Sequence, residues 1–316
     1  MSKRFIFAEH NIPLPSIWPH YRTIAANLPP DQITTRKIGS VDHEIPAGSV
    51  AIFAESPTPI AIPRPFKLVH AFHGLAEKGY TYEVCRNRAF DLILSPGPRA
   101  TSILIANGID PAKIAEVGMP KLDGVFNRPA HVRGSRPVVL YAPTGIGDWR
   151  SSLRRIRPEH LINSDAYELR FRVHPLDKRG YEKLAAEWAE AGAMIDRNFD
   201  PVKIFDGVDL LISDYSSIAI EFALTGRPVL KLGFTEWLDN PNLINDFEFT
   251  STFTRSVDVG TGGRNLFRDV TEMLSGASNP PEFDAALETI IPRHLRDGRA
   301  GQRAAAAIMK LIEAGS

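Results

Sequence analysis

The sequence predicts an α/β fold of two doubly wound, Rossmann-like domains that face a cleft, and three observations support this. Apolar runs of strand length alternate with segments of helical period, the pattern of parallel sheets covered by helices. The alternation is present in both halves of the chain and stops between them in one polar stretch. The chain also has 316 residues, whereas single hydrophobic cores stop growing at about 250–300 residues.

The first half contains short apolar runs that Pro and Gly clusters separate. We expect strands there at residues 5–8, 50–54, 67–72 and 92–95. The first run follows Lys3 and Arg4, but it is far too short for the apolar region of a secretory signal. We therefore interpret it as a strand.

Residues 127–137 are polar, rich in Pro and Gly and without apolar periodicity, so we expect the interdomain linker there. This linker predicts domains at residues 1–130 and 131–316. The second half repeats the alternation of the first. Its strands are expected at residues 138–142, 169–173, 210–213 and 229–232, with a helix at residues 181–191 between two of them.

Residues 299–314 carry apolar side chains on one helical face and predict an amphipathic terminal helix. We expect it to brace the fold, with the N-terminal domain as one surface to which it can return. Binding to a membrane surface is the weaker alternative, because the apolar face is mostly alanine and the polar face holds few basic residues.

The composition excludes several classes of function. Lys plus Arg and Asp plus Glu each number 37, so no net field draws the chain to nucleic acid or anionic lipid. Cys85 is the only cysteine, which excludes an internal disulfide framework and fits the reducing cytoplasm. No run of 18 apolar residues is present, so we expect no membrane span, while contact with the inner membrane face stays open.

Ser216 and Ser217 follow the strand expected at residues 210–213 and precede a helix expected at residues 218–224. The first N–H groups of a helix lack internal partners and the helix dipole is positive there, so this turn predicts an anion site with two extra hydroxyl donors. The alternative is that Ser217 is only a helix cap, worth ~1 kcal/mol. Asp214 would repel an anion, and we expect it to orient the turn by hydrogen bonding.

His73 follows the strand expected at residues 67–72 and precedes Gly74, so it stands at a strand's carboxyl end. Ligands of open α/β sheets bind there. An imidazole titrates near neutral pH and can take a proton from an attacking hydroxyl as a general base. The alternative is a histidine with a satisfied hydrogen bond and no catalytic role, and that is the interpretation we give to His70 inside the strand.

His174 repeats this arrangement in the second half, where Pro175 ends the strand. Protonated, and next to Arg172, it could hold a phosphate oxygen and stabilise a leaving group. A turn histidine is the alternative. Thr144 ends another strand and adds a hydroxyl, followed by Gly145, where backbone can approach a ligand closely.

The sequence lacks the common motifs of several other kinds of binding and catalytic site. The sequence has no Walker-type phosphate loop, no complete Gly-x-Gly-x-x-Gly, no His-Glu-x-x-His and no acid pair in a glycosidase-like context. We therefore expect neither a nucleotide-hydrolysing motor nor a catalytic metal.

Five separated motifs form a more specific pattern when they are taken together. They are Phe72-His73-Gly74, Gly118-Met119-Pro120-Lys121-Leu122-Asp123, Tyr141-Ala142-Pro143-Thr144, Arg172-Val173-His174-Pro175 and the segment from Asp209 to Ser217. In order and spacing, over about residues 68–232, they resemble the CDP-glycerol glycerophosphotransferase family, which includes the teichoic-acid primases and polymerases. The Asp-Tyr-Ser-Ser block with the downstream Gly226-Arg227-Pro228 is the most specific part.

The resemblance implies GT-B architecture and transfer of a polyol phosphate, with glycerol phosphate favoured, from a CDP-linked donor to an acceptor hydroxyl with release of CMP. The acceptor would be a glycan or lipid-linked saccharide of a teichoic-acid-like polymer or capsule, and no cofactor or nucleic acid is implied. Residues 1–130 would form the acceptor side and residues 131–316 the nucleotide-donor side.

The resemblance also implies roles for the matched residues. His73 would be the catalytic base and His174 a second catalytic residue. The donor phosphates or nucleotide would be bound by Thr144, Arg172, Asp214, Ser216 and Ser217, and the acceptor side would include Gly74 and Lys78.

Departures from the family pattern leave alternatives open. Phe72 replaces the usual Trp, and Leu75 replaces a Thr beside the proposed base, so the acceptor or the polyol can differ. The chain lacks the long basic extensions expected of a processive polymerase, which favours a single addition. The alternatives are a GT-B glycosyltransferase or epimerase of a UDP-sugar and a non-catalytic nucleotide-binding protein. The presence of both histidines favours an enzyme.

Overall fold

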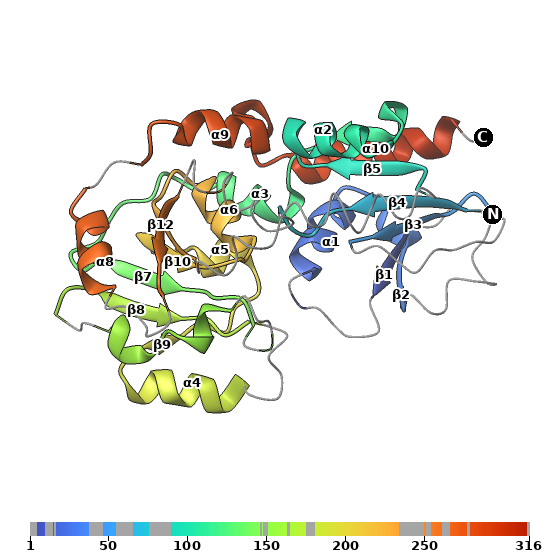
Figure 1. Ribbon diagram of the computed structural model, residues 1–316. Coiled ribbons are helices and arrows are strands. Elements are labelled where there is room, and N and C mark those ends of the chain that lie inside the picture. The colour runs from blue at the N-terminus through green and yellow to red at the C-terminus, as the bar shows by residue number, and fades with distance from the viewer. Residues whose placement is uncertain are drawn as a thin grey trace. The chain divides into compact units, whose positions relative to one another are not determined.

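The structure is a computed structural model, and it contains two compact units (Figure 1). It describes residues 5–9, 15, 17–37, 47–54, 66–75, 90–145, 147, 151–162, 165–174, 181–233, 250, 254–260, 266–276 and 279–314. Unit 1 is Met1–Arg128 with Glu288–Ser316, and unit 2 is Pro129–Leu287. The chain therefore divides differently from the sequence-based boundaries at its C-terminal end, where residues 288–316 return to unit 1.

Unit 1 is built on a six-stranded parallel sheet in the order β2-β1-β3-β4-β5-β6. The strands are β1 (Phe5–Glu9), β2 (Ile33–Lys37), β3 (Val50–Phe53), β4 (Lys67–Ala71), β5 (Leu92–Ser95) and β6 (Ile114–Glu116). The helices are α1 (Trp18–Ala25), α2 (Pro98–Ala106), α3 (Asp123–Phe126) and α10 (Ala300–Ala314). Side chains of α1 and α10 pack on one face of the sheet and those of α2 on the other.

The C-terminal helix is fastened to unit 1 by a buried carboxylate. Asp123 accepts hydrogen bonds from the backbone N–H groups of Ala300 (2.9 Å) and Gly301 (2.8 Å), which lie in the first turn of α10 and lack helical partners. Burial raises the pKa of Asp123, although these two hydrogen bonds oppose the rise. Along the helix, Ala304 and Ile308 are buried in the core of unit 1. This end of the motif that begins at Gly118 thus has a structural role.

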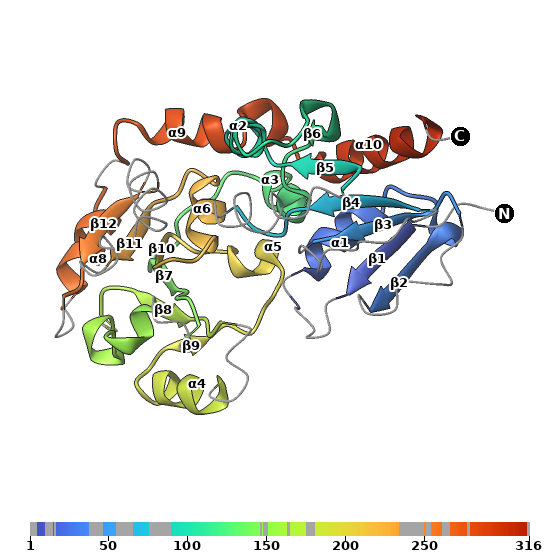
Figure 2. The ribbon, with the colours of Figure 1, turned by 45° about the vertical axis from the view of Figure 1, so that its right-hand side comes forward.

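Unit 2 contains a second six-stranded parallel sheet, in the order β12-β11-β10-β7-β8-β9. Its strands are β7 (Val138–Tyr141), β8 (Glu168–Phe171), β9 (Met194–Ile195), β10 (Leu210–Ser213), β11 (Val229–Gly233) and β12 (Arg255–Asp258). Its helices are α4 (Tyr181–Glu190), α5 (Pro201–Ile204), α6 (Ile218–Ala223), α8 (Phe267–Leu274) and most of α9 (Phe283–Ile290). Within this unit, α6 lies on the opposite side of the sheet from α8 (Figures 1 and 2). The predicted α/β fold with two parallel sheets is confirmed.

Short 3₁₀ segments complete the described elements. They are η1 (Pro30–Gln32), η4 (Pro111–Lys113), η5 (Pro120–Leu122), η6 (Ser152–Arg154), η7 (Pro158–His160) and η9 (Arg293–Leu295). No helix in the described ranges is both long and apolar enough to cross a membrane.

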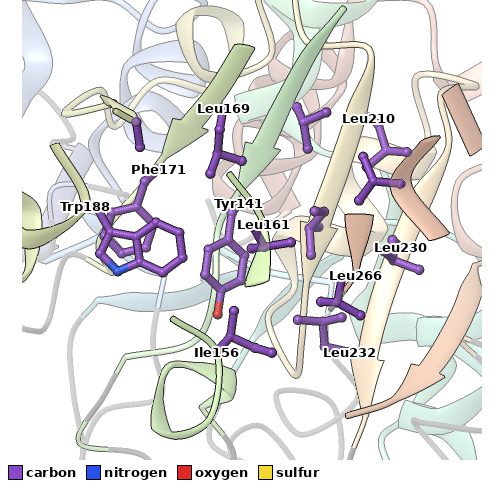
Figure 3. Packing of buried hydrophobic residues seen from close by; sticks show 14 of the residues in the cluster. Tyr141, Ile156, Leu161, Leu169, Phe171, Trp188, Leu210, Leu230, Leu232 and Leu266 are labelled. Carbon is purple, nitrogen blue, oxygen red and sulfur yellow. The ribbon is translucent and has the colours of Figure 1, made fainter. Parts of the chain in front are cut away.

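An aromatic stack anchors the centre of unit 2 (Figure 3). The rings of Phe171 and Trp188 are stacked with centroids 4.3 Å apart, and the ring of Tyr141 lies 5.2 Å from that of Trp188. Such pairs add about 0.5–1.5 kcal/mol each beyond the area that they bury. Because Tyr141 and Phe171 are the last residues of β7 and β8, the stack fixes the two strand ends from which Thr144 and His174 follow.

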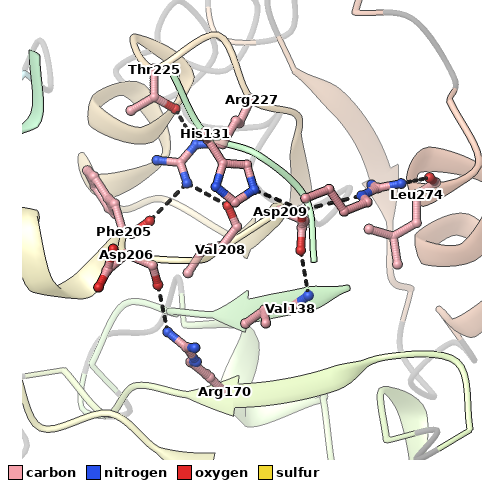
Figure 4. Close-up of polar contacts among 11 residues, drawn as sticks. His131, Val138, Arg170, Phe205, Asp206, Val208, Asp209, Thr225, Arg227 and Leu274 are labelled. Atoms are coloured by element: carbon pink, nitrogen blue, oxygen red, sulfur yellow. Dashed lines mark hydrogen bonds and ion pairs between the residues drawn. The ribbon is translucent and has the colours of Figure 1, made fainter. Parts of the chain in front are cut away.

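A group of polar contacts lies at the opposite end of this sheet, where its strands begin (Figure 4). Asp209, just before β10, accepts from the N–H of Val138 (2.7 Å) and lies 2.9 Å from His131 Nε2 and 3.3 Å from Arg133 Nε. Burial alone would raise the pKa of Asp209, but the hydrogen bonds from His131 and Val138 bring it below its ordinary value. Asp209 thereby ties the expected linker segment to unit 2.

Arg227, in the Gly-Arg-Pro motif, lies at the same end of the sheet (Figure 4). Its guanidinium donates to the carbonyl oxygens of Phe205 (2.9 Å) and Val208 (2.5 Å) and covers the ring of Phe222, 4.5 Å from the centroid. Burial lowers its pKa to about 10. These contacts join the end of α5 to α6, so the motif contributes to the scaffold at the strand edge away from the two serines.

Candidate functional site

Six predicted site residues follow three neighbouring strands of unit 2. β10, β7 and β8 are adjacent and parallel, with Ile212 beside Tyr141 and Tyr141 beside Phe171. Their carboxyl ends therefore meet at one edge of the sheet, within about 10 Å because neighbouring strands are about 4.8 Å apart. The residues that follow these ends are Thr144 after β7, Arg172 and His174 after β8, and Asp214, Ser216 and Ser217 after β10.

Asp214 is the hydrogen-bond centre of this edge. It is 1% exposed, and its two carboxylate oxygens accept four hydrogen bonds of 2.7 Å, from the backbone N–H and the hydroxyl of both Thr144 and Ser152. The proton of the Ser152 hydroxyl is used in this way, so the Tyr141 hydroxyl, at 2.8 Å, donates to the Ser152 oxygen. Burial raises the pKa of Asp214, and the four hydrogen bonds oppose the rise.

This arrangement gives Asp214 the orienting role expected of it, because both of its oxygens accept hydrogen bonds from the turns at Thr144 and Ser152. It also limits Thr144, because a hydroxyl has one proton and that of Thr144 is donated to Asp214. In this geometry the Thr144 side chain can accept from a ligand but does not donate to a phosphate. The carbonyl of Thr144 accepts from the Ser151 hydroxyl at 2.6 Å, which further fixes the turn.

The two serines are half-buried at the start of α6. Ser217 occupies the cap position, but its side chain makes no cap hydrogen bond and instead donates to Glu221 Oε1 at 3.2 Å. The interpretation of Ser217 as a simple helix cap is therefore wrong. Since α6 has only six residues, its dipole is small, and the serine hydroxyls are the main polar groups here.

Arg172 and His174 lie just beyond β8, which ends at Phe171. Arg172 is buried, donates to the carbonyl of Val173 at 3.3 Å, and has its guanidinium carbon 5.7 Å from the ring centroid of Phe199. Phe199 is 36% exposed and was not singled out from the sequence. His174 is half-buried. This part of the edge thus combines a cation, an imidazole and an aromatic ring.

In unit 1, His73 lies just beyond β4 with its ring held in one orientation. Its Nδ1 is 2.7 Å from the carbonyl oxygen of Ala54, which follows β3 on the neighbouring strand. A carbonyl can only accept, so Nδ1 carries the proton and Nε2 is the basic nitrogen of the neutral ring. This is the tautomer that a general base acting through Nε2 needs. Gly74 follows it, half-buried, and Lys78 lies outside the described residues.

Two further histidines, His20 in α1 and His70 in β4, are buried near His73. Burial and then the nearby His73 lower the pKa of His70 to about 3, and burial, Lys121 and both other histidines lower that of His20. His70 packs edge-on against Phe72, with centroids 4.4 Å apart. It was expected to have a satisfied hydrogen bond, but neither of its ring nitrogens makes one within the described part of the chain.

Sequence reasoning did not single out the residues that orient the predicted site residues by hydrogen bonds. Ser151 and Ser152 bind the turn of Thr144 and Asp214, and Tyr21 accepts a hydrogen bond from Ala54, whose carbonyl binds His73. None of these three residues lies in a motif, and nothing in the sequence around them indicates these contacts. Among the residues that the structure describes, no group of three or more His, Cys, Asp or Glu is arranged to hold a metal ion.

Comparison with known proteins gives a family match. The family model described as CDP-glycerol:poly(glycerophosphate) glycerophosphotransferase matches residues 72–234, just over half of the chain. A teichoic acid poly(glycerol phosphate) polymerase of Staphylococcus epidermidis is 25% identical in an alignment 169 positions long that covers 44% of this chain and 22% of that protein. The match thus spans about a fifth of the length of this curated relative.

Solved structures show a shared fold. The wall teichoic acid polymerase TagF superposes with a TM-score of 0.63 at 16% identity, over 99% of this chain and 90% of that one. UDP-GlcNAc 2-epimerase from Neisseria meningitidis, bound to UDP-GlcNAc, superposes with a TM-score of 0.59 at 11% identity, over 97% of this chain and all of that one. The expected GT-B architecture is thereby confirmed.

Proposed function

The chain belongs to the CDP-glycerol:poly(glycerophosphate) glycerophosphotransferase family, and from this premise we propose that it transfers a polyol phosphate from a CDP-linked donor to an acceptor hydroxyl. Glycerol phosphate is the favoured group. The acceptor oxygen attacks the phosphorus that bears the polyol, the bond from that phosphorus to the bridging oxygen breaks, and CMP leaves with the bonding electrons. The proton of the acceptor hydroxyl passes to His73.

The geometry of His73 carries this proposal. The hydrogen bond from Nδ1 to the Ala54 carbonyl leaves Nε2 as the nitrogen that takes the proton. Phosphoryl transfer depends mainly on positioning and on neutralising charge. In the proposal, Arg172, His174 and Ser216 supply these at the donor phosphates, and Ser217 joins them by turning its hydroxyl proton from Glu221 to a phosphate oxygen. Asp214 and Thr144 hold the turn beside them.

We extend the proposal to the acceptor, which we take to be a glycan or a lipid-linked saccharide reached at the inner face of the cell membrane. The family description names a poly(glycerophosphate), which supports a polymer as the acceptor. The saccharide and the membrane face are our extension of it. The product on this acceptor can be a single addition or a polymer. The length of the product formed on a defined saccharide acceptor distinguishes the two.

A donor panel tests the function itself. The chain is incubated with CDP-glycerol, CDP-ribitol and UDP-sugars, each with a saccharide acceptor, and released CMP, UMP and UDP are separated and quantified. CMP release with one of the CDP-polyols is expected. Release of UDP, or epimerisation of a UDP-sugar without release, would instead support the alternatives that share this fold. Binding of every donor without product would support a non-catalytic protein.

The base is tested by His73→Ala in the same assay. We expect CMP release to fall by about 10²–10⁴-fold, the contribution of general acid–base catalysis, while CDP binding, measured by calorimetry, changes little. His294→Ala is the matched control, because His294 is an exposed histidine of the same unit. Unchanged turnover of His73→Ala would contradict the assignment.

A further inference from the structure

We propose that Tyr21 is a positioning residue for His73: its buried hydroxyl holds Ala54 in the place where the Ala54 carbonyl fixes the base. The inference rests on the proposed function, in which His73 accepts the proton. It concerns a residue that lies outside all of the motifs and is far from His73 in the sequence.

The hydroxyl of Tyr21 joins the carboxyl ends of two strands. Tyr21 lies in α1 and is 3% exposed. Its oxygen accepts from the N–H of Ala54 at 2.7 Å and donates to the carbonyl of Ala8 in β1 at 2.8 Å, with the carbonyl of Ile52 at 3.3 Å. A phenol hydroxyl has one proton and two lone pairs, so it can donate and accept in this way at the same time.

The position of Ala54 explains why it needs such a partner. The pairing of β3 with β1 ends at Ile52 and its pairing with β4 ends at Phe53. Ala54 is therefore the first residue beyond the sheet ladder, where backbone order has to come from another element. Its N–H is bound to Tyr21, and its carbonyl accepts from His73 Nδ1 at 2.7 Å. Tyr21 and His73 are thus linked through one residue.

The ring of Tyr21 is held independently of its hydroxyl. Its centroid lies 5.0 Å from that of Phe7 and 6.4 Å from that of Trp18. A Tyr21→Phe variant keeps the ring in this packing and removes only the atom that binds Ala54. The Ala54 carbonyl is then free to shift, and the His73 ring loses its preference for the Nδ1-protonated tautomer.

The ionisable groups around His73 must be considered in any pH measurement. They are His20 and Tyr21 of α1, His70 of β4 and Lys121 of η5. Burial keeps the pKa values of His20 and His70 below their ordinary range, so both are neutral near pH 7 and do not titrate with the base. None of the variants compared replaces Lys121.

The kinetic test compares wild type, Tyr21→Phe, His73→Ala and the double variant in the CMP-release assay. We expect Tyr21→Phe to lower kcat by about 10- to 100-fold, the effect of a small misplacement of a catalytic group, with KM for the donor within about twofold. In the His73→Ala background the same substitution should cost nothing more, because the group that it positions is gone. Trp18→Phe, which alters the packing of Tyr21 without touching its hydroxyl, is the control and should keep its kcat.

A second measurement does not depend on activity. The ¹⁵N chemical shifts of the His73 ring report which nitrogen carries the proton, with assignment by His73→Ala. Wild type should show a protonated Nδ1 and Tyr21→Phe a mixture of tautomers. The inference is overturned if the variant keeps the wild-type tautomer, or if kcat falls equally with and without His73. Failure of the wild type to release CMP would count against the proposed function, and the tautomer measurement would still decide the role of Tyr21.

Discussion

Replacement of Asp214 by Asn tests whether this carboxylate stabilises the fold or binds the donor. The carboxylate accepts two hydrogen bonds at each oxygen, and at both oxygens one donor is a backbone N–H and the other a hydroxyl. An amide keeps one acceptor oxygen and puts an NH₂ group at the other position. The hydroxyl facing that NH₂ can rotate and accept, but the backbone N–H cannot.

The expected cost follows from this count. One buried N–H is left without a partner, at about 1–3 kcal/mol, and the remaining bonds lose the extra strength of a charged acceptor. Part of this is offset because a neutral amide is easier to bury than a carboxylate. We expect a net loss of about 2–4 kcal/mol, or a fall in Tm of roughly 5–15 °C for a unit of this size.

The assay is urea unfolding of wild type and variant, followed by fluorescence, together with CDP binding by calorimetry below the transition. Asp200→Asn is the matched control in the same unit. Asp200 caps α5 through the N–H of Val202 at 3.0 Å, and Asn caps equally well, so its stability should change by less than about 0.5 kcal/mol. If Asp214→Asn keeps wild-type stability and loses only CDP binding, the carboxylate binds the donor and the reasoning is refuted.

Two further predictions concern the amino-terminal edge of the same sheet. Arg227→Ala should lower the free energy of unfolding, measured in urea, by about 2–4 kcal/mol, because two backbone carbonyls lose a charged donor and the ring of Phe222 loses its cation. An unchanged midpoint of the urea unfolding curve would contradict the structural role of Arg227. The pKa of Asp209 is lowered in the fold, so its stabilisation is present above its unfolded pKa of about 3.9 and is lost as the pH falls through the lower folded value. Asp209→Asn should therefore flatten the acid side of the plot of unfolding free energy against pH, and an unchanged slope there would show that the His131 and Arg133 contacts add nothing.

The strands that the sequence predicted best are those buried on both faces. Residues 92–95 and 210–213 are continuous apolar runs up to a closing serine and coincide with β5 and β10. By contrast, β2 (Ile33–Lys37) is a polar edge strand with Thr and Arg, and β12 (Arg255–Asp258) is another edge strand with a charged residue at each end. Their pairing depends on a neighbouring strand, which local apolar periodicity does not reveal.

The sequence likewise predicted only part of the candidate site. Residues at the carboxyl ends of the central strands, such as His73 and Ser216, could be found because strand ends are visible in the sequence and the motifs mark them. The sequence analysis expected Asp214 to orient the turn by hydrogen bonding, but it did not identify the groups that donate to it. Its partner Ser152 was not predicted, because the two residues meet only after β7 and β10 have paired.

The two units order the backbone beyond their strands by the same kind of hydrogen bond. A residue beyond the end of a parallel strand no longer makes the backbone hydrogen bonds that order the sheet. In unit 1 the hydroxyl of Tyr21 holds Ala54, and in unit 2 the carboxylate of Asp214 holds Thr144. In each case one buried polar side chain from another element binds the backbone N–H of the first residues after a strand. Because such a tether orders a turn rather than the core, its loss in unit 1 should reduce catalysis more than stability. Asp214 differs in that it binds two segments at once, and its loss should reduce both.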